Sequence, residues 1–204
     1  MPKSISTQLE SLNLISGPAI KRIFDQKYKD VLEVEIKSCS DFIKEMWTRY
    51  LARRTKNPGL NGYVFEGLLA VLFYRLGISP IFLQAKMAFI PNVEFDFVAY
   101  SKEIGPIVLS AKTSLRERYK QADLEGMMMR QVHRRAKSYL LTLNAAEAKN
   151  INSKIQEGKV LGLDRVYVAS ESEFDDLVEE LTSYTLIEPA AKPVVQSSRI
   201  IRPS

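Results

Sequence analysis

Two short apolar stretches carry an acidic and a basic side chain whose spacing could support catalysis. Asp96 lies in the stretch 93–98, and Lys112 ends the stretch 107–112. Mg²⁺ is usually held by one or two carboxylates and water, and a nearby ammonium can stabilise the charge that develops on an attacked phosphate. The pair therefore indicates a metal-dependent phosphodiesterase. The alternative is a cross-strand ion pair at the edge of a sheet.

Alternation along the two stretches decides whether these side chains can meet. If both stretches are strands, Asp96 points to one face of the sheet, and Phe95 and Phe97 point to the other. Ser110 and Lys112 share a face of the second strand. Because only a turn separates the strands, we expect a compact hairpin in which Asp96 and Lys112 converge.

Glu66 is a further carboxylate in an unusual setting. Its neighbours are almost all apolar, and they are expected to form a helix over about residues 63–76. Burial of an unpaired carboxylate is costly, so Glu66 needs a metal ion or a basic side chain as its partner. The alternative is a glutamate that faces solvent near the helix start, where the helix dipole favours negative charge.

In their order along the chain, Glu66, Asp96 and Lys112 resemble the active site of the PD-(D/E)XK nuclease superfamily. The position two residues before the lysine is normally acidic in this superfamily, whereas here it is Ser110. The same Ser/Cys-X-Lys variant occurs in one branch of the type II restriction endonucleases, which includes EcoRII, SsoII and NgoMIV. That branch carries its second acid on the following helix, and Glu125 matches this migrated acid.

The resemblance implies a restriction-endonuclease-like fold and a Mg²⁺ ion held by Asp96 and Glu125. A helix that starts at residue 114 would place Glu125 about 15 Å along its axis. Glu125 then reaches the metal only if the helix folds back across the strand ends, and Asp123 is the alternative ligand. The catalytic residues that the resemblance implies are Asp96, Lys112, Glu125, Glu66 and Ser110.

The segment that starts at Lys112 resembles a second signature of the same branch. Residues 112–121 read K-T-S-L-R-E-R-Y-K-Q, which is similar to the element K-T-x-x-(R/K)-(E/D)-R-x-x-Q. In that branch the Arg-acid-Arg trio reads CC:GG steps in the major groove. The chemistry agrees, because arginine makes bidentate bonds to guanine and glutamate accepts from cytosine. Arg116, Glu117 and Arg118 are therefore the expected base readers.

Glu117 also has an alternative role, and further side chains are candidate DNA contacts. Together with Ser114, Glu117 satisfies the capping-box pattern for a long helix that we expect to run to about residue 143.

Trp47 beside Tyr50 could stack on an extruded base, although core packing is the alternative. The candidate DNA contacts are Lys120, Gln121, Arg53, Arg54 and Trp47.

The remaining pattern predicts an α/β fold, a central mixed sheet flanked by helices and preceded by N-terminal helices. Residues 8–55 show helical spacing, and a buried strand is expected over residues 165–170 with a helix near residues 174–181. We expect a single domain over residues 1–204. Its parts are a helical segment (1–60), a catalytic and DNA-recognition core (61–143), a completion of the sheet and helices (144–188) and an extended tail (189–204).

Composition limits the partners and the setting of the protein. A net charge of +5 favours a polyanionic partner, and the single cysteine, Cys39, excludes an internal disulfide. The longest apolar run is too short to cross a membrane, so we expect a cytoplasmic protein without a membrane partner. Since one active site cuts one strand, we expect a homodimer on a palindromic site, formed by the N-terminal helices or the helix after residue 115.

The resulting hypothesis is a Mg²⁺-dependent type II restriction endonuclease that cuts double-stranded DNA at a palindromic site containing CC and GG. A cognate DNA methyltransferase would then protect the DNA of the host. Two alternatives remain open. One is a repair or transposon-type nuclease of the same fold, and the other is a non-catalytic DNA-binding protein.

Overall fold

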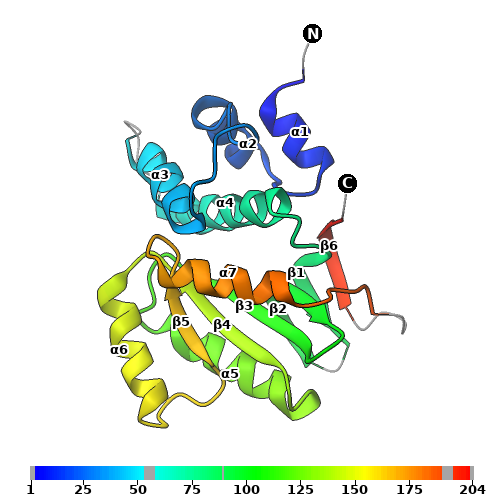
Figure 1. The fold of residues 1–204 in the computed structure, drawn as a ribbon, viewed down its shortest axis with the longest axis vertical. Coiled ribbons are helices and arrows are strands. Elements are labelled where there is room, and N and C mark those ends of the chain that lie inside the picture. Colours follow the sequence, from blue (N-terminus) through cyan, green and yellow to red (C-terminus); the bar gives the residue numbers. More distant parts are fainter. Residues whose placement is uncertain (1–2, 53–57, 89, 190–194, 203–204) are drawn as a thin grey trace.

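A six-stranded mixed sheet with helices on both faces forms the centre of the computed structural model, which describes residues 3–52, 58–88, 90–189 and 195–202 (Figure 1). The expected α/β fold with N-terminal helices is confirmed. The strand order is β5-β4-β3-β2-β1-β6. The strands are β1 (Ile81–Met87), β2 (Ile90–Ser101), β3 (Gly105–Ala111), β4 (Lys137–Thr142), β5 (Arg165–Val168) and β6 (Val195–Ile201).

The sheet is antiparallel on one side and parallel on the other. β1 pairs antiparallel with β2 and β6, and β2 with β3, while β3, β4 and β5 are parallel. Parallel neighbours need a crossover connection, which the helices α5 (Arg118–Val132) and α6 (Ala145–Gln156) supply. β2 and β3 form the expected compact hairpin, whose last pair is Ser101 and Gly105.

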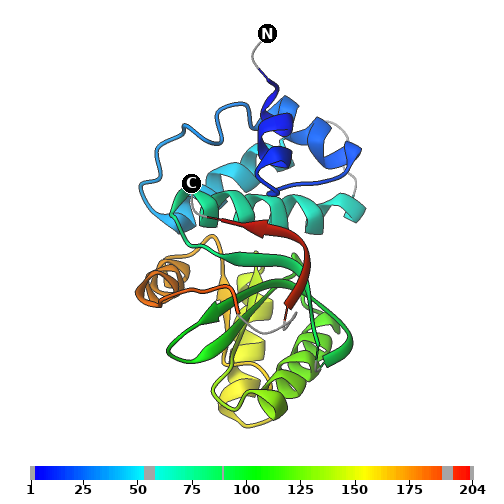
Figure 2. The same ribbon diagram turned by 90° about the vertical axis from the view of Figure 1, so that its right-hand side faces the viewer.

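The helices form a layer on each face of the sheet (Figures 1 and 2). The larger core joins one face to α4 and α7, and the other face packs on α5 and α6. α4 is apolar around its whole circumference because it lies between this face and the other N-terminal helices, so both of its sides are buried. The helices of this layer are α1 (Ile5–Ser11), α2 (Pro18–Lys27), α3 (Cys39–Leu51), α4 (Asn61–Arg75) and α7 (Glu173–Ser183).

The expected long helix over residues 114–143 is wrong at both ends. α5 starts at Arg118 and ends at Val132, and residues 137–142 form the buried strand β4 between β3 and β5. A short apolar run fits a buried strand as well as a helix by its periodicity alone. Its place between two strands, with which it forms parallel ladders on both sides, decided the outcome.

The extended tail is also corrected, because part of it is a strand of the sheet. β6 pairs with β1 over the register Ile81 to Ile201 and Met87 to Val195. It is drawn red beside β1 in Figure 2. An edge strand offers unpaired N–H and C=O groups that a returning chain can satisfy. The C-terminal residues thus complete the sheet beside β1, which is the neighbour of the strand that carries Asp96.

One expected side-chain direction is wrong as well. Phe95 and Phe97 do not share a face, since Phe95 belongs to the core under α5 and Phe97 to the core under α4. The neighbouring strand is irregular at this point, where Gln84 has a positive φ of 48°. The irregularity lies beside Asp96, which is flanked by these two phenylalanines.

The described residues contain no helix that is both long enough and apolar enough to cross a membrane.

Candidate active site

Asp96 and Lys112 meet where β3 ends. The Lys112 Nζ donates to Asp96 Oδ2 at 2.6 Å, and the backbone N–H of Ala111 donates to the same oxygen at 2.7 Å. The backbone N–H of Lys112 donates to the carbonyl of Leu141 in β4 at 2.9 Å. Both side chains are mostly buried, with 17% and 19% exposed. The expected convergence is therefore present, and the backbone of three strands holds it in place.

Glu66 faces this pair from α4. The pKa of its carboxyl is raised from 4.5 to about 7, first by burial and then by the negative charge of Asp96, whereas Lys112 and Arg199 act in the opposite direction. The expected partner for Glu66 is thus a group of basic side chains. The alternative of a solvent-facing glutamate does not fit, because the side chain is partly buried and lines the same pocket as Asp96 and Lys112.

Glu125 reaches the same region from the opposite face of the sheet. Its side chain is buried, and burial raises the pKa of the carboxyl, which also interacts with Lys112 and Asp96. The side-chain amide of Gln121 donates to Glu125 Oε1 at 2.8 Å. Since α5 begins at Arg118, Glu125 lies only about 10 Å along its axis. The late start of α5 removes the geometric difficulty that a helix from residue 114 would create.

Asp123, the alternative ligand, has a structural role. Its Oδ1 accepts from the backbone N–H of Leu161 at 2.9 Å and of Gly162 at 2.5 Å. A Cβ at Gly126 would lie 2.3 Å from the carbonyl oxygen of Gly162, so the helix and this loop touch backbone to backbone. Asp123 therefore fixes the position of α5 rather than contributing to the pocket.

Ser110 is buried on β3, at the position where the PD-(D/E)XK pattern has an acid. It brings no charge to the site. The carboxylates come instead from α4, β2 and α5, which are Glu66, Asp96 and Glu125. The site therefore retains three acids although the usual position of one of them is neutral.

The three expected base readers lie where the turn after Lys112 leads into α5: Arg116 and Glu117 precede the helix, and Arg118 is its first residue. Arg116, Glu117 and Arg118 are all exposed, and the two arginines line the same pocket as Asp96. Arg116 has a positive φ of 26°, a strained conformation for a residue with a Cβ. Strain of this kind persists only where the surroundings impose it, so the turn has one defined shape.

The expected capping box is absent from this turn. Glu117 forms an ion pair with Lys120 at 2.5 Å, and the hydrogen bond from Lys120 lowers the pKa of the Glu117 carboxyl. Ser114 does not cap α5, since its hydroxyl donates to Glu147 of α6 at 3.4 Å. The backbone N–H of Leu115 donates to the same carboxylate at 2.6 Å, and the Leu115 side chain is fully buried. Leu115 and Glu147 thus anchor the turn.

The pocket that is lined by Glu66, Asp96 and Lys112 has a volume of about 870 Å³. Its lining comes from the start of α4, from β2 and from the segment between β3 and α5. The charged residues in its lining are Glu66, Glu94, Asp96, Lys112, Arg116 and Arg118. Three acids and three basic residues thus line the same pocket.

The remaining candidate DNA contacts differ in their positions. Lys120 and Gln121 are exposed on α5, one paired with Glu117 and the other with Glu125. Trp47 is partly buried and packs on Tyr50, with 4.9 Å between the ring centroids. Tyr50 is itself fully buried, so core packing is the role of this pair and base stacking is ruled out for Tyr50. Arg53 and Arg54 lie outside the described residues.

The donor atoms fit a Mg²⁺ ion held by few protein ligands. Within the part of the chain that is described, no three His, Cys, Asp or Glu side chains already form a metal-binding group. Asp96 accepts a hydrogen bond from Lys112, and the carboxyl of Glu125 interacts with both, so two carboxylates with hard oxygens lie near the same lysine. Burial is the main cause of the raised pKa values of Glu66 and Glu125. Mg²⁺ is commonly bound by one or two carboxylates with water.

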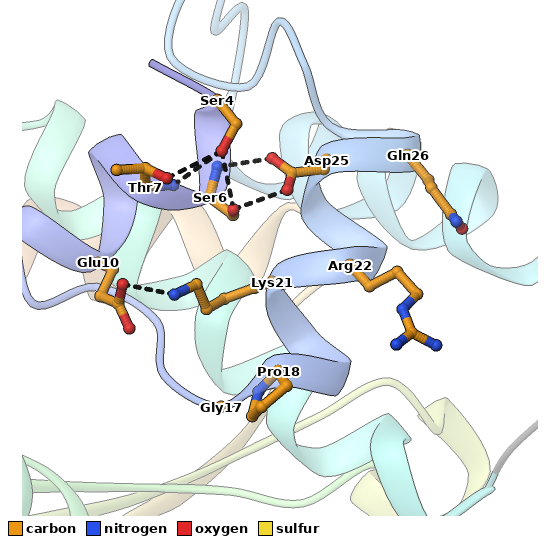
Figure 3. Close-up of a pocket in the computed structure, with 10 residues that line it drawn as sticks. All are labelled: Ser4, Ser6, Thr7, Glu10, Gly17, Pro18, Lys21, Arg22, Asp25 and Gln26. Atoms are coloured by element: carbon orange, nitrogen blue, oxygen red, sulfur yellow. Dashed lines mark hydrogen bonds and ion pairs between the residues drawn. The ribbon is translucent and has the colours of Figure 1, made fainter.

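A second pocket, between α1 and α2, has a volume of about 650 Å³ and does not contain any of these residues (Figure 3). Several of its polar groups bond to one another. Asp25 accepts from the backbone N–H and the hydroxyl of Ser6 at 2.9 and 2.7 Å, and Lys21 pairs with Glu10 at 2.6 Å. These contacts join the two helices, and the hydrogen bonds from Ser6 lower the pKa of Asp25 against the opposing effect of burial.

Two side chains near the site, those of Arg199 and Glu147, are not part of any sequence motif described above. Arg199 of β6 interacts with Glu66, and its NH1 group donates to the carbonyl of Leu14 at 3.0 Å. Glu147 lies three residues after Asn144, which caps α6 by accepting from the Glu147 N–H at 3.1 Å. The Asn-x-x-Glu pattern identifies a helix start, but only the fold reveals that this glutamate reaches across to the turn.

Comparisons with protein families, with curated proteins and with solved structures found no match.

Proposed function

We propose that the protein is a Mg²⁺-dependent type II restriction endonuclease that hydrolyses double-stranded DNA at a palindromic site containing CC and GG. One observation carries the proposal: Glu66, Asp96, Lys112 and Glu125 come from four separate segments of the chain and interact electrostatically where β3 ends. Glu66, Asp96 and Lys112 line one pocket, and Glu125 approaches the pair from α5. A simple edge ion pair would need only Asp96 and Lys112. Burial of two further carboxylates near this pair is unfavourable for folding, and an ion pair alone would not require it.

Each of these side chains has a distinct task in the proposed reaction. Asp96 and Glu125 would hold the metal ion, which when bound activates water and polarises the phosphate. The Lys112 Nζ would donate to a non-bridging oxygen of the scissile phosphate and stabilise its developing charge. Glu66, whose pKa is about 7, can accept a proton near neutral pH.

The turn with Arg116, Glu117 and Arg118 would read the bases. Arginine recognises guanine through O6 and N7, and a carboxylate accepts from the N4 amino group of cytosine. Both arginines line the pocket of the catalytic groups, so base reading and cleavage would occur on neighbouring nucleotides. In the proposed complex Glu117 exchanges its exposed ion pair with Lys120 for a cytosine, at small cost because such pairs contribute little.

A homodimer would place two such sites on the two strands. α5 has an exposed apolar stripe made of Leu124, Met128 and Val132, which are 61%, 37% and 40% exposed. Their spacing of four residues keeps them on one side of the helix. Stripes of this kind favour contact with another protein surface. We propose that two copies meet along α5, and that a cognate methyltransferase protects the host DNA.

Digestion of supercoiled plasmid DNA with Mg²⁺ tests the proposal. Discrete bands whose ends map to one CC/GG-containing palindrome are expected. Lys112→Ala should lower the cleavage rate by about 100-fold or more, as the loss of a group that stabilises transition-state charge usually does. The matched control is Lys149→Ala, an exposed lysine on α6, which should cleave like the wild type.

The same digestion identifies the two alternatives. A smear or structure-dependent nicking would indicate a nuclease without site recognition, in conflict with the role of the arginines. DNA binding without cleavage under any metal condition would indicate a non-catalytic binding protein, and cleavage by Lys112→Ala at the wild-type rate would refute the role of the lysine.

A further inference from the structure

The pocket of the candidate active site has two chemically different walls. The charged wall is formed by the turn before α5 and the start of α5, which carry Arg116 and Arg118. The uncharged wall comes from the lining residues between Pro58 and Tyr63, which belong to the short 3-10 helix Pro58–Leu60 and the first turn of α4. A phosphate would bind at the charged wall. The uncharged wall would therefore contact a different part of the DNA.

Tyr63 is the main feature of the uncharged wall. It is 55% exposed, and it is the only aromatic residue among the large exposed apolar side chains within the described ranges. Tyr63 precedes Glu66 by three residues, so both lie on one face of α4. Tyr63 also makes no side-chain hydrogen bond or ring contact with the described part of the protein. The fold gains little from an aromatic ring in this place.

Gly62 makes the wall accessible. A Cβ at this position would have a single atom within 4 Å, Glu66 Oε1 at 3.9 Å, so the space above the backbone is open. Its φ is not in the left-handed region, and nothing in the backbone therefore requires a glycine. Glycine weakens a helix relative to alanine. Its presence in the first turn of α4 is understandable if another molecule approaches the backbone there.

The chemistry of duplex DNA indicates what approaches. In a duplex the faces of the bases are occupied by stacking, and the apolar surface next to a phosphate belongs to the deoxyribose. We propose that Tyr63 and Gly62 form a subsite for the deoxyribose next to the scissile phosphate. The ring of Tyr63 packs on the sugar while Gly62 admits the strand close to α4. The phosphate is thereby directed toward Asp96 and Lys112.

This inference rests on the proposed function and predicts the effect of three substitutions. Tyr63→Ala should lower kcat/KM for a duplex that contains the mapped cleavage site by about ten-fold or more, because misplacement of the phosphate is costly. For Tyr63→Phe, kcat/KM should stay within about three-fold of the wild-type value, because phenylalanine keeps the aromatic ring that makes the contact. Gly62→Ala should cleave about ten-fold more slowly although its thermal midpoint is unchanged or higher.

Leu161→Ala is the control, because Leu161 is exposed outside this pocket, and it should cleave like the wild type. The inference is overturned if Tyr63→Ala cleaves like the wild type or if Tyr63→Phe is as slow as Tyr63→Ala. It is also overturned if 2-aminopurine in the duplex brightens on binding to the wild type but not to Tyr63→Ala, because the ring would then stack on an extruded base.

Binding measured in EDTA separates failure of the subsite from failure of the proposed function. If the wild type binds the duplex in EDTA but does not cut it once Mg²⁺ is supplied, the nuclease proposal fails, and the subsite is then judged by Kd alone. In that case Tyr63→Ala should bind about five-fold more weakly or worse, and Tyr63→Phe should bind like the wild type. Equal Kd values for all three proteins, or absence of any DNA binding, overturn the subsite.

Discussion

Replacement of Glu66 by glutamine should make the protein more stable at pH 8. Burial and the charge of Asp96 raise the pKa of this carboxyl from 4.5 to about 7, which means that the folded protein disfavours the charged form. Glutamine has the same shape but cannot ionise. It therefore removes an electrostatic cost that the wild type tolerates, in a region that we propose to be catalytic.

The sign and size of the effect follow from proton linkage. Below about pH 4.5 the carboxyl is protonated in both the folded and the unfolded chain, and its ionisation does not reduce stability. As the pH rises through the folded pKa of about 7, the folded state loses stability, and the loss is complete above that pH. The full loss is about 3 kcal/mol at pH 8 and under about 1 kcal/mol at pH 5.

Urea unfolding of the wild type and Glu66→Gln at pH 5 and pH 8, in the presence of EDTA, measures both values. The variant should gain about 3 kcal/mol over the wild type at pH 8 and much less at pH 5. The control is Glu33→Gln, an exposed glutamate in the segment between α2 and α3, which should not differ from the wild type at either pH. An equal difference at both pH values, or a variant that is less stable at pH 8, would refute the reasoning.

Three further predictions concern recognition, assembly and packing. Arg116→Ala should lose about 1–3 kcal/mol of binding to the cognate site and little to unrelated DNA, measured by fluorescence anisotropy; an equal loss on both would show a phosphate contact. Met128→Glu should convert a dimer to a monomer in sedimentation velocity, and an unchanged dimer would exclude α5 from the interface. Gly126→Ala should lower the free energy of unfolding by about 1–3 kcal/mol, because its Cβ would lie 2.3 Å from the carbonyl oxygen of Gly162. Gly62→Ala is the control, because a Cβ at Gly62 meets open space. A similar loss in the free energy of unfolding for both variants would contradict this account.

The prediction of the central hairpin from the sequence succeeded because its evidence is local. Side chains alternate along a strand, and a turn joins the two strands, so Asp96 and Lys112 had to meet if the strands formed. The 2.6 Å contact between them agrees with this argument. Even here the alternation fails for Phe95 and Phe97, since the irregularity beside Gln84 depends on the neighbouring strand.

The helix after Lys112 could not be located correctly from local signals. The capping-box pattern of Ser114 and Glu117 is genuine as a pattern, yet Ser114 bonds to Glu147, which lies on another helix. Competition from a distant carboxylate moved the helix start to Arg118. That shift shortens the distance along the helix axis from the start of α5 to Glu125. A helix from residue 114 would have placed Glu125 too far from Asp96, whereas the observed helix does not.

The sequence by itself determined the α/β class, the hairpin that joins Asp96 to Lys112, and the identity of the acids that could accompany them. These follow from periodicity and turn chemistry, which act over a few residues. Only the tertiary structure decided that Glu66 and Glu125 reach the pair from opposite faces, that Glu147 anchors the turn of Arg116, and that the C-terminal segment closes the sheet. Such contacts join residues far apart in sequence, and they depend on packing and burial that no local pattern encodes.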